Sequence, residues 1–335
     1  MANRPWVRIV IVTFNSGNFT QACVDALASQ TECQFEAVIV DNKSVDGAID
    51  KLQLPDQRFS ILHAKENLGF SGGSNLGLRS AATPYVMTLN PDCFLAPECL
   101  SALRSATEQF PRDQMFSPIL FKDKTLMTLD GAGDSFSAFG LGWRNGGGQP
   151  LVKHQTDITR VAEVFSPTGA AALYGRDFFA KVGGFDERFF CYIEDTDLAL
   201  RIRARGGRCL LISEAKGVHS GGHSSNEIPS FAVEQSVKNN LFLIIKSAPL
   251  LLMPIMLMLH TAAHIRFQTR NSGTRIAKFR KTAFLYSLKK LPIYLLYRFQ
   301  RKPYPLGASF RIAKSLSWSI QEVKMRPLKV LRYVK

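Results

Sequence analysis

The sequence predicts an α/β fold in which a mostly parallel central sheet is flanked by helices and followed by a basic, helical C-terminal region. Two patterns indicate the sheet: short buried runs rich in β-branched residues alternate with helical stretches, and polar residues stand at the carboxyl end of each run. The length of 335 residues, of which 46% are hydrophobic and 21% charged, suits one large domain with an appendage, or two domains, and an ample core. This composition argues against a disordered chain.

The expected elements follow one another as βα units. Strands are predicted at the apolar runs 7–13, 35–40, 59–62, 85–89 and 209–212. Helices are predicted to end at Ala28 and near Ala82, to span 96–103 and to begin near Glu194. Residues 122–160 are rich in glycine and weak in periodicity, so we expect an inserted loop region or irregular strands over the site, before order returns at 164–174.

Parallel strands bring their carboxyl ends to one edge, where open α/β sheets bind ligands. The polar residues expected at this edge are Thr13, Asn15, Asp41, Asn42, Asn90 and Asp92. A lone carboxylate such as Asp92 can ligate a hard divalent cation, Mg²⁺ or Mn²⁺, that takes most of its other oxygens from a diphosphate and water. His219 is the expected second ligand. The alternatives are a turn or helix-capping role for Asp92 and a structural role for His219.

A glycine-rich segment, residues 67–75, lies between two predicted strands and opens a helix. Glycines let backbone amides approach a ligand closely, and a helix N-terminus attracts phosphate, so a diphosphate could bind nearby. The spacing does not fit the G-x-G-x-x-G fingerprint of dinucleotide-binding proteins. A plain turn is the alternative.

Three carboxylates, Glu194, Asp195 and Asp197, lie within four residues, directly after an aromatic run. In a helix that begins near Glu194, Asp197 and Arg201 stand four residues apart and can pair, while Asp195 points elsewhere. Crowded carboxylates raise one another's pKa, which points to a chemical role. The alternative is a charged first turn of a surface helix.

The basic charge is concentrated at the C-terminal end. The formal net charge is +15, yet residues 1–263 sum to −2, because 18 of the Lys and Arg residues follow His264 beside a single acid, Glu322. The apolar runs 241–245 and 250–259 are shorter than the roughly 18 to 20 residues of a membrane-spanning helix. The mixture of cationic and aromatic residues fits kinked helices adsorbed on the anionic headgroups of a lipid bilayer better than it fits a membrane-spanning helix. The alternative is a helical subdomain that packs its apolar stripe on the body.

Nucleic-acid binding through the basic region is a rival interpretation. The region mixes its Lys and Arg with Leu, Tyr and Phe and lacks a recognised binding motif, so we expect no nucleic-acid partner. The six cysteines show no metal-ligand spacing, and residues 1–8 lack the apolar stretch of a signal peptide. We therefore expect a cytoplasmic protein with free, buried thiols.

The order of these motifs resembles GT-A glycosyltransferase family 2, and in particular its rhamnosyltransferase-like branch. The motifs are VIVTFNS, VDNKSVDG, NLGFSGGSNLG, LNPD and SPTGAAALYGRDFFAKVGGFDERFFCYIEDTDLALRIRARG, followed by His219, over about residues 7–245. The resemblance implies a GT-A fold and an inverting transferase that uses a nucleotide-diphosphate sugar and a divalent metal. Lys43 and the region after Lys246 depart from the family pattern.

The resemblance also assigns roles to residues. Thr13, Asn15, Asp41 and Asn42 would hold the nucleotide base and ribose. The family's metal-binding D-x-D motif is Asn90-Pro91-Asp92, which keeps only its last acid. Asp195 would be the catalytic base, with its pKa raised by Glu194 and Asp197 and tempered by Arg201. The remaining expected donor-side residues are Asn67, Gly69, Phe70, Gly73 and Asn75, and those expected on the acceptor side or in support are Asp186, Glu187, Glu194, Asp197 and Arg201.

These inferences combine into one expected function. Residues 1–245 would form the transferase domain and residues 246–335 a membrane-associating region on the inner face of the cell membrane. The enzyme would move rhamnose from dTDP-rhamnose onto a lipid-linked glycan for a cell-surface polysaccharide. Galactofuranose, glucose and N-acetylglucosamine from UDP remain alternative donors, and a catalytically inactive sugar-nucleotide-binding protein is a further alternative.

Overall fold

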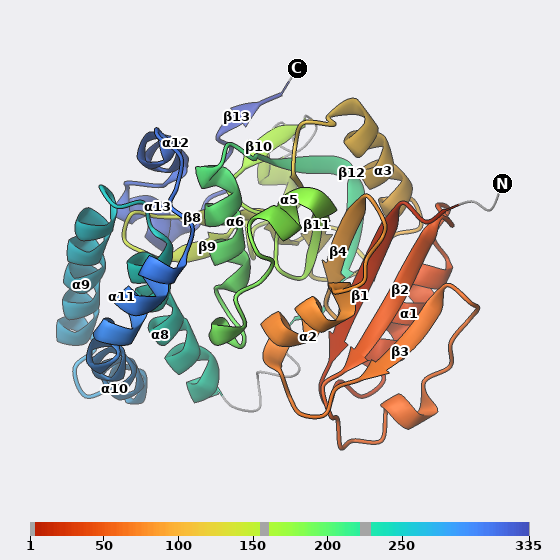
Figure 1. Cartoon of the computed structure of the whole chain (residues 1–335), viewed down its shortest axis with the longest axis horizontal. Coiled ribbons are helices and arrows are strands. Elements are labelled where there is room, and N and C mark those ends of the chain that lie inside the picture. The colour runs from red at the N-terminus through yellow and green to blue at the C-terminus, as the bar shows by residue number, and fades with distance from the viewer. Residues whose placement is uncertain (1–3, 155–160, 222–228, 335) are drawn as a thin grey trace.

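Parallel strands form the half of the sheet nearest the N-terminus in the computed structural model, which describes residues 4–154, 161–221 and 229–334 (Figure 1). These strands are β1 (Val7–Thr13), β2 (Phe35–Asp41), β3 (Phe59–His63) and β4 (Tyr85–Leu89). They pair in the order β4-β1-β2-β3, each parallel to its neighbour. All four begin at the predicted residue and end within one residue of the prediction, because apolar runs rich in β-branched and aromatic residues favour strands. β1, β2 and β4 are largely buried, whereas the edge strand β3 is partly exposed.

Helices cover both faces of this parallel region. They are α1 (Phe19–Ala28), α2 (Gly69–Leu78) and α3 (Cys99–Gln109), with a short 3-10 turn η1 (Ile49–Lys51) beside them. Side chains of α1 and α3 pack with Ile9 and Ile11 of β1, whereas Leu78 of α2 packs with Val10. This division follows from the two-residue period of a strand, which sends Ile9 and Val10 to opposite faces.

The rest of the sheet is mixed in direction. Its strands are β5 (Cys93–Leu95), β6 (Met115–Phe121), β7 (Leu129–Ala132), β10 (Ala162–Val164), β11 (Ala171–Gly175), β12 (Cys209–His219) and β13 (Arg332–Tyr333). Strand β11 runs antiparallel to both of its neighbours, β4 and β6. The predicted α/β fold is confirmed, but the sheet is mostly parallel only in its first half. The chain reaches β11 from short irregular strands rather than through a crossover helix, so its direction is reversed.

The glycine-rich region holds short strands and turns. Strands β8 (Asp134–Phe136) and β9 (Gly142–Arg144) form a separate antiparallel pair, and η2 (Leu151–His154) follows. Residues 155–160 of this region lie outside the described part of the chain. Asp134 and Arg144 stand opposite each other in this pair, and burial raises the pKa of the Asp134 carboxyl well above its usual value.

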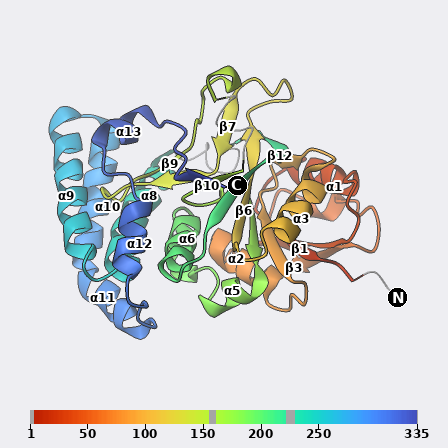
Figure 2. The same cartoon turned by 90° about the horizontal axis from the view of Figure 1, so that it is seen from above.

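A layer of helices stands beside the sheet (Figures 1 and 2). Its members are α5 (Arg176–Lys181), α6 (Glu194–Ala204), α8 (Pro229–Ser247), α9 (Met253–Arg270), α10 (Arg275–Lys289), α11 (Leu291–Gln300), α12 (Ala308–Ser315) and α13 (Ile320–Met325). Helix α8 contacts α6, α9, α10 and α11 and so joins the carboxylate-bearing helix α6 to the outer helices. None of the described helices is long and apolar enough to cross a membrane.

The C-terminal region is tied to the body by polar contacts. Arg298 donates from Nη1 to the carbonyl oxygens of Ile245 and Ala248, each at 2.8 Å, and Arg311 donates to the Ala204 carbonyl at the end of α6. Strand β13 extends the main sheet by pairing with β10. The expected boundary between residues 245 and 246 falls inside α8, so this helix belongs to both parts.

Candidate functional site

The loop that follows β1 and the loop that follows β2 are joined by hydrogen bonds. The backbone N–H of Asn15 donates to Ser44 Oγ at 3.1 Å, and Asn15 Oδ1 accepts from the Val45 N–H at 2.8 Å. Thr13 Oγ1 lies 2.9 Å from Thr20 Oγ1, and the buried Asp41 accepts from the Ser44 N–H at 3.0 Å. The four expected nucleotide residues therefore lie at one edge of the sheet, where Asn42 is fully buried behind the others.

The side chain of Asn42 is hydrogen-bonded to the glycine-rich segment. Its Nδ2 donates to the Gly69 carbonyl at 2.9 Å, and Asn67 Oδ1 accepts from the Gly69 N–H, also at 2.9 Å. Gly69 has a φ of +67° and stands where a Cβ would lie 2.4 Å from the Phe190 carbonyl oxygen. Glycine is required there by both the backbone conformation and the close approach.

Most of the segment 67–75, which the sequence suggested as a phosphate-binding loop, forms the first part of a helix. Helix α2 begins at Gly69 and ends at Leu78, earlier than the predicted end near Ala82. A Cβ on Gly73 or Gly77 would lie 2.7 Å from a methyl group of Val12 or Val10. These glycines allow α2 to pack closely on β1. The N–H groups at the start of α2 are also bound within the protein, that of Gly69 by Asn67 Oδ1 and that of Ser71 by the Phe190 carbonyl at 3.0 Å, so the segment packs on the protein itself and not as an open phosphate-binding loop.

Phe70 and Asn75 point away from the nucleotide edge. The Phe70 ring packs edge-on to Phe185 with centroids 5.7 Å apart. Asn75 donates to the Phe185 carbonyl at 2.8 Å and to Glu187 Oε1 at 3.0 Å, and it accepts from the Phe185 N–H. Both residues therefore join α2 to the segment that precedes α6.

A carboxylate and an imidazole meet where β4 and β12 end. His219 Nε2 lies 3.4 Å from Asp92 Oδ1, while His219 Nδ1 lies 2.7 Å from Asp130 Oδ2. Burial alone would lower the pKa of His219, but hydrogen bonds to Asp130 and Asp92 outweigh it and raise the pKa. A carboxylate on Nδ1 directs Nε2 outward, as in many metal-binding histidines. Asn90 stands beside this pair, with its N–H donating to the Ala170 carbonyl at 2.8 Å.

These side chains fit a metal that receives few ligands from the protein. Among the described residues no three His, Cys, Asp or Glu side chains are grouped to hold a metal ion by themselves. One carboxylate oxygen from Asp92 and one neutral imidazole from His219 suit Mn²⁺ or Mg²⁺ only if substrate oxygens and water complete the coordination. Asp130 contacts the imidazole from the far side and would orient it.

Asp195 lies in the first turn of α6, with Oδ1 accepting from the Thr196 N–H at 2.6 Å. Burial raises the pKa of Asp195, while hydrogen bonds from Thr196 and the positive charge of Arg144 oppose the rise. The expected cause, repulsion by Glu194 and Asp197 tempered by Arg201, is therefore wrong. Burial, followed by the charge of Asp195, raises the pKa of Glu194 well above its usual range. Burial therefore disfavours the charged form of Glu194 more strongly than that of Asp195.

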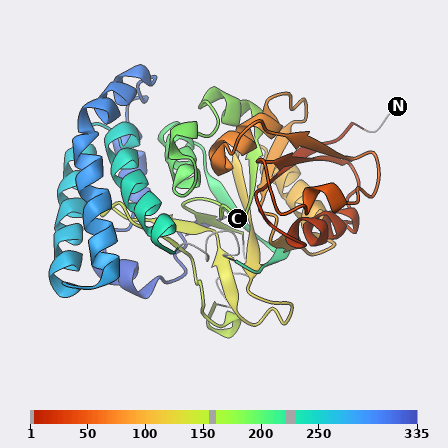
Figure 3. The same ribbon diagram turned by 90° about the horizontal axis from the view of Figure 1, so that it is seen from below.

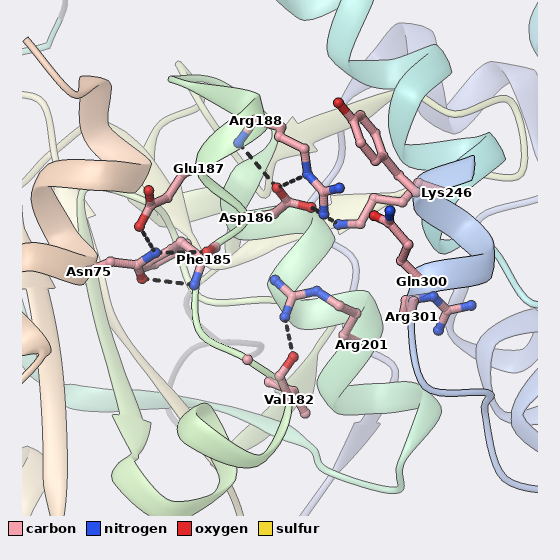
Figure 4. Close-up of a pocket in the computed structure, with 12 residues that line it drawn as sticks. Asn75, Val182, Phe185, Asp186, Glu187, Arg188, Arg201, Lys246, Gln300 and Arg301 are labelled. Atoms are coloured by element: carbon pink, nitrogen blue, oxygen red, sulfur yellow. Dashed lines mark hydrogen bonds and ion pairs between the residues drawn. The ribbon is translucent and has the colours of Figure 1, made fainter. Parts of the chain in front are cut away.

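Asp197 and Arg201 belong to a buried ion network with Lys246 and Asp186. Figure 4 shows Arg201, Lys246 and Asp186 of this network. Arg201 Nε donates to Asp197 at 2.8 Å, and Lys246 Nζ lies 3.1 Å from Asp197 and 2.5 Å from Asp186. Although burial acts in the opposite direction, Arg201 and Lys246 hold the pKa of Asp197 below its usual value. Asp197 is fully buried, so it supports α6 and does not reach a substrate.

The network borders a polar cavity of about 340 Å³. Figure 4 shows Asp186 between Arg188 and Lys246, and Glu187 turned toward Asn75. Asp186 accepts from Arg188 Nε at 2.7 Å. The 3-10 turn η3 (Glu187–Phe189) separates this cavity from the turn that leads to Asp195. Asp186 and Glu187 therefore lie together with Asp197 and Arg201, on the side of α6 that faces α8.

The turn before Asp195 has an unusual backbone. Phe190, Tyr192 and Ile193 have φ angles of 62°, 68° and 73°, although none is glycine. A positive φ is rare for large side chains and costs most for a β-branched residue such as Ile193. The Nδ2 of the buried Asn239 of α8 lies 2.9, 2.9 and 2.8 Å from the carbonyl oxygens of Phe189, Cys191 and Tyr192, so its two hydrogens serve the three acceptors with one hydrogen shared. This single side chain holds the strained turn in place.

Asp130, Arg144, Asn239 and Lys246 were not expected at the site. Arg144 Nη1 lies 2.6 Å from Asp130 Oδ2 and 3.3 Å from His219 Nδ1, and its positive charge lowers the pKa of Asp195. Asp130 and Arg144 lie in the glycine-rich region, and Asn239 and Lys246 lie in α8, where no local pattern marks them. Their roles depend on neighbours far away in the sequence.

Comparison with known proteins finds a family similarity in the N-terminal part of the chain and a shared fold. Residues 8–129 match the family described as Glycosyl transferase family 2. The fold is that of GalNAc-T7 bound to UDP, GalNAc and Mn²⁺, with a TM-score of 0.60 and 15% identity over 91% of this chain and 60% of that chain. Residues 8–129 are thus similar to family 2 glycosyltransferases, and the chain has the GT-A fold. The mannosyltransferase PcManGT of Pyrobaculum calidifontis, in complex with GDP-Man and Mn²⁺, matches this glycosyltransferase with a TM-score of 0.51 and 16% identity, over 93% of this chain and 87% of that one.

A curated relative is more similar in sequence. The glycosyltransferase is 25% identical over 240 residues to the N-acetylglucosaminyl-diphospho-decaprenol L-rhamnosyltransferase of Mycobacterium tuberculosis, a match that covers 66% of this chain and 78% of the relative. The resemblance to the rhamnosyltransferase-like branch of the family is thereby confirmed.

Proposed function

We propose that this glycosyltransferase inverts the anomeric centre of a sugar, with rhamnose from dTDP-rhamnose as the expected donor, during transfer to a lipid-linked glycan. The observation that carries the proposal is the placement of Asp195 against the segment that also binds Asn90. A Cβ on Gly169 would lie 2.5 Å from Asp195 Oδ2, and the next residue, Ala170, accepts from the Asn90 N–H at 2.8 Å. Asp92 of the same motif lies 3.4 Å from His219, and the positive charge of Arg144, which pairs with Asp130, lowers the pKa of Asp195. This arrangement supplies a base on one side of a reacting centre and charge stabilisation for a diphosphate on the other.

An inverting transfer is a single displacement at the anomeric carbon. The acceptor oxygen bonds to that carbon as the bond to the diphosphate breaks, and Asp195 takes the proton of the acceptor hydroxyl. A divalent metal held by Asp92 and His219 would supply positive charge to the departing diphosphate. Arg144, two-fifths exposed, adds a cation beside both groups. Thr13, Asn15 and Asp41 would bind the nucleotide at the strand edge.

The lipid-linked acceptor is supported by the relative, whose name specifies a diphospho-decaprenol substrate and rhamnose. An enzyme with such an acceptor would work at the inner face of the cell membrane, in the synthesis of a cell-surface polysaccharide. UDP-galactofuranose, UDP-glucose and UDP-N-acetylglucosamine are alternative donors, because the donor is selected by the shape of the pocket.

Calorimetric titration of the purified protein with dTDP, UDP and GDP, each with and without Mn²⁺, tests the proposal without requiring the acceptor. We expect Mn²⁺-dependent binding with a preference for dTDP. A preference for UDP would replace rhamnose by one of the alternative sugars. Absence of binding to every nucleotide would overturn the transferase proposal.

Substitution of Arg144 by Gln should move the acidic limb of the pH profile of kcat/KM to higher pH. Asp195 works as a carboxylate, and Arg144 lowers its pKa, so loss of the cation raises that pKa and protonates the base at a higher pH. Arg176→Gln, which removes a surface cation paired with Asp177, is the control and should leave the limb in place. An unmoved limb in Arg144→Gln would show that Arg144 does not act on the base.

Substitution of Asn239 by Leu should lower kcat by about 10²-fold, the loss typical of a small misplacement of a catalytic group. Leu has a similar size but cannot donate to the three carbonyl groups, so the strained turn relaxes and Asp195 shifts. Nucleotide affinity, measured by calorimetry, should stay unchanged. The control is Asn240→Leu, since the neighbouring Asn240 has an Oδ1 without a hydrogen-bond partner in the described structure. Equal losses of kcat in both variants would refute a specific role for Asn239.

A further inference from the structure

Large apolar side chains are exposed along the three outer helices α9, α10 and α11. The exposed ones are Ile255, Met258 and Ile265 on α9, Ile276, Leu285, Tyr286 and Leu288 on α10, and Ile293, Leu295, Leu296 and Phe299 on α11. We call this set, with the cations between its members, the outer helical face. Phe299 is 82% exposed and Met258 64%. Exposed apolar patches of this extent mark interaction surfaces.

The outer helical face points away from the sheet. Helices α9, α10 and α11 each contact α8, which separates them from α6. Figures 2 and 3 show these helices at the end of the molecule opposite the parallel strands. An apolar groove on α9, lined by Pro254, Met258, Ala262 and Ile265 among others, opens on the same layer. The sheet and its helices already have a core, so these side chains are not needed for it.

Helix α11 has the most apolar exposed surface. Its exposed positions are Pro292, Ile293, Leu295, Leu296, Phe299 and Gln300, so all but one are apolar. Phe299 follows Leu295 by four residues and Leu296 by three, so these side chains form one stripe. Buried residues of α8 lie behind the helix, where Tyr294 packs on Phe242 with ring centroids 4.7 Å apart. The helix therefore presents its apolar stripe outward on a fixed support.

The charge on the three helices is of one sign. Residues 253–300 contain nine Lys and Arg residues and no Asp or Glu. The exposed cations include Arg275, Lys278, Lys281 and Lys289 on α10, between the apolar positions of the same helix. Cations that alternate with apolar side chains suit contact with a lipid bilayer, which has an apolar interior and anionic headgroups at its boundary.

We propose that the outer helical face adsorbs on an anionic lipid bilayer, with the apolar side chains of α11 at the acyl boundary and the cations of α10 at the phosphate groups. A second copy of the chain is disfavoured as the occupant, because the same face would oppose cations to cations with no acid between them. Adsorption through this face would hold the enzyme beside a lipid-linked acceptor. Only this consequence rests on the proposed function.

Vesicle co-sedimentation of the full chain tests the proposal. The probes are vesicles of phosphatidylcholine alone and of phosphatidylcholine with phosphatidylglycerol. We expect binding to the anionic vesicles, weakened by high salt, and at least about tenfold weaker binding of the double variant Leu296→Glu with Phe299→Glu, which loses apolar contact and gains two repelled charges. The matched control, Met127→Glu with Val152→Glu, changes two exposed apolar residues far from these helices and carries the same added charge. The control should bind as the unaltered chain does.

Three results would overturn the proposal: no binding of the unaltered chain to anionic vesicles, equal losses in the α11 variant and the control, or a dimer in solution that the α11 variant dissociates. A variant with Lys289→Gln and Lys290→Gln should weaken binding while keeping the apolar stripe. Calorimetric nucleotide binding by the α11 variant should be normal. Normal vesicle binding without any nucleotide binding would refute the transferase proposal alone, so the two failures can be distinguished.

Discussion

Replacement of Asp195 by Asn should reduce sugar transfer by about 10²–10⁴-fold, the usual contribution of a general base. The carboxamide has the size of the carboxylate and can still accept the hydrogen bond from the Thr196 N–H through its oxygen. It cannot take the proton of an acceptor hydroxyl. Because Asp195 is not among the residues at the nucleotide edge, the affinity for the nucleotide should be unchanged in a calorimetric titration.

Glu194→Gln is the matched control for this variant. Glu194 is buried beside Asp195, and burial raises its pKa well above the usual range, so the neutral Gln side chain of the same size suits this environment. We expect Glu194→Gln to retain most of the transfer rate. If Asp195→Asn lost nucleotide binding together with activity, Asp195 would be a donor-site or folding residue instead of the base.

Replacement of Asp92 by Asn should remove the Mn²⁺-dependent part of nucleotide binding. The amide oxygen is a weaker ligand than a carboxylate, and Asp92 is the single acid of its motif. Asp130→Asn should weaken Mn²⁺-dependent binding by about 10–100-fold, as expected for a residue that orients a ligating histidine. We expect Asp92→Asn to lose more than Asp130→Asn in the same titration.

The titration without Mn²⁺ provides the control for both substitutions. The metal-independent affinity should be equal in the unaltered chain and in the two variants, because Thr13, Asn15 and Asp41 are untouched. Retention of full Mn²⁺ dependence in Asp92→Asn would contradict the assignment of Asp92 as a metal ligand. Loss of affinity in the absence of metal would indicate damage to the nucleotide edge.

The parallel half of the fold was predictable because its signals are local. The continuous runs at Val7–Thr13 and Tyr85–Leu89 match β1 and β4 residue for residue. The polar residues after these runs were placed at one edge by the geometry of parallel strands, and the structure brings Asn15 and Asp41 to that edge through Ser44. The spacing of Asp197 and Arg201 likewise predicted their pair.

The remaining features depend on contacts that no local pattern records. Gly69 and Gly73 were expected to approach a ligand, but Gly69 lies against the Phe190 carbonyl and Gly73 against the side chain of Val12 in β1. Arg144 is a single cation in a glycine-rich stretch, and its place near Asp195 follows from the pairing of β8 with β9. The role of Asn239 depends on the packing of α8 against a turn that lies 47 to 50 residues earlier in the chain, a contact that no local sequence pattern indicates.

The attachment of β13 to the sheet affects how the chain can be shortened. The Leu331 N–H donates to the Glu163 carbonyl at 2.7 Å, the Val334 N–H donates to the Val161 carbonyl at 2.9 Å, and Arg332 pairs with the Glu163 carboxylate at 2.6 Å. Truncation before Leu331 would uncover β10 as an unpaired edge strand, a common starting point for aggregation. A shortened enzyme without the outer helices would therefore have to retain or replace this last strand to remain monodisperse.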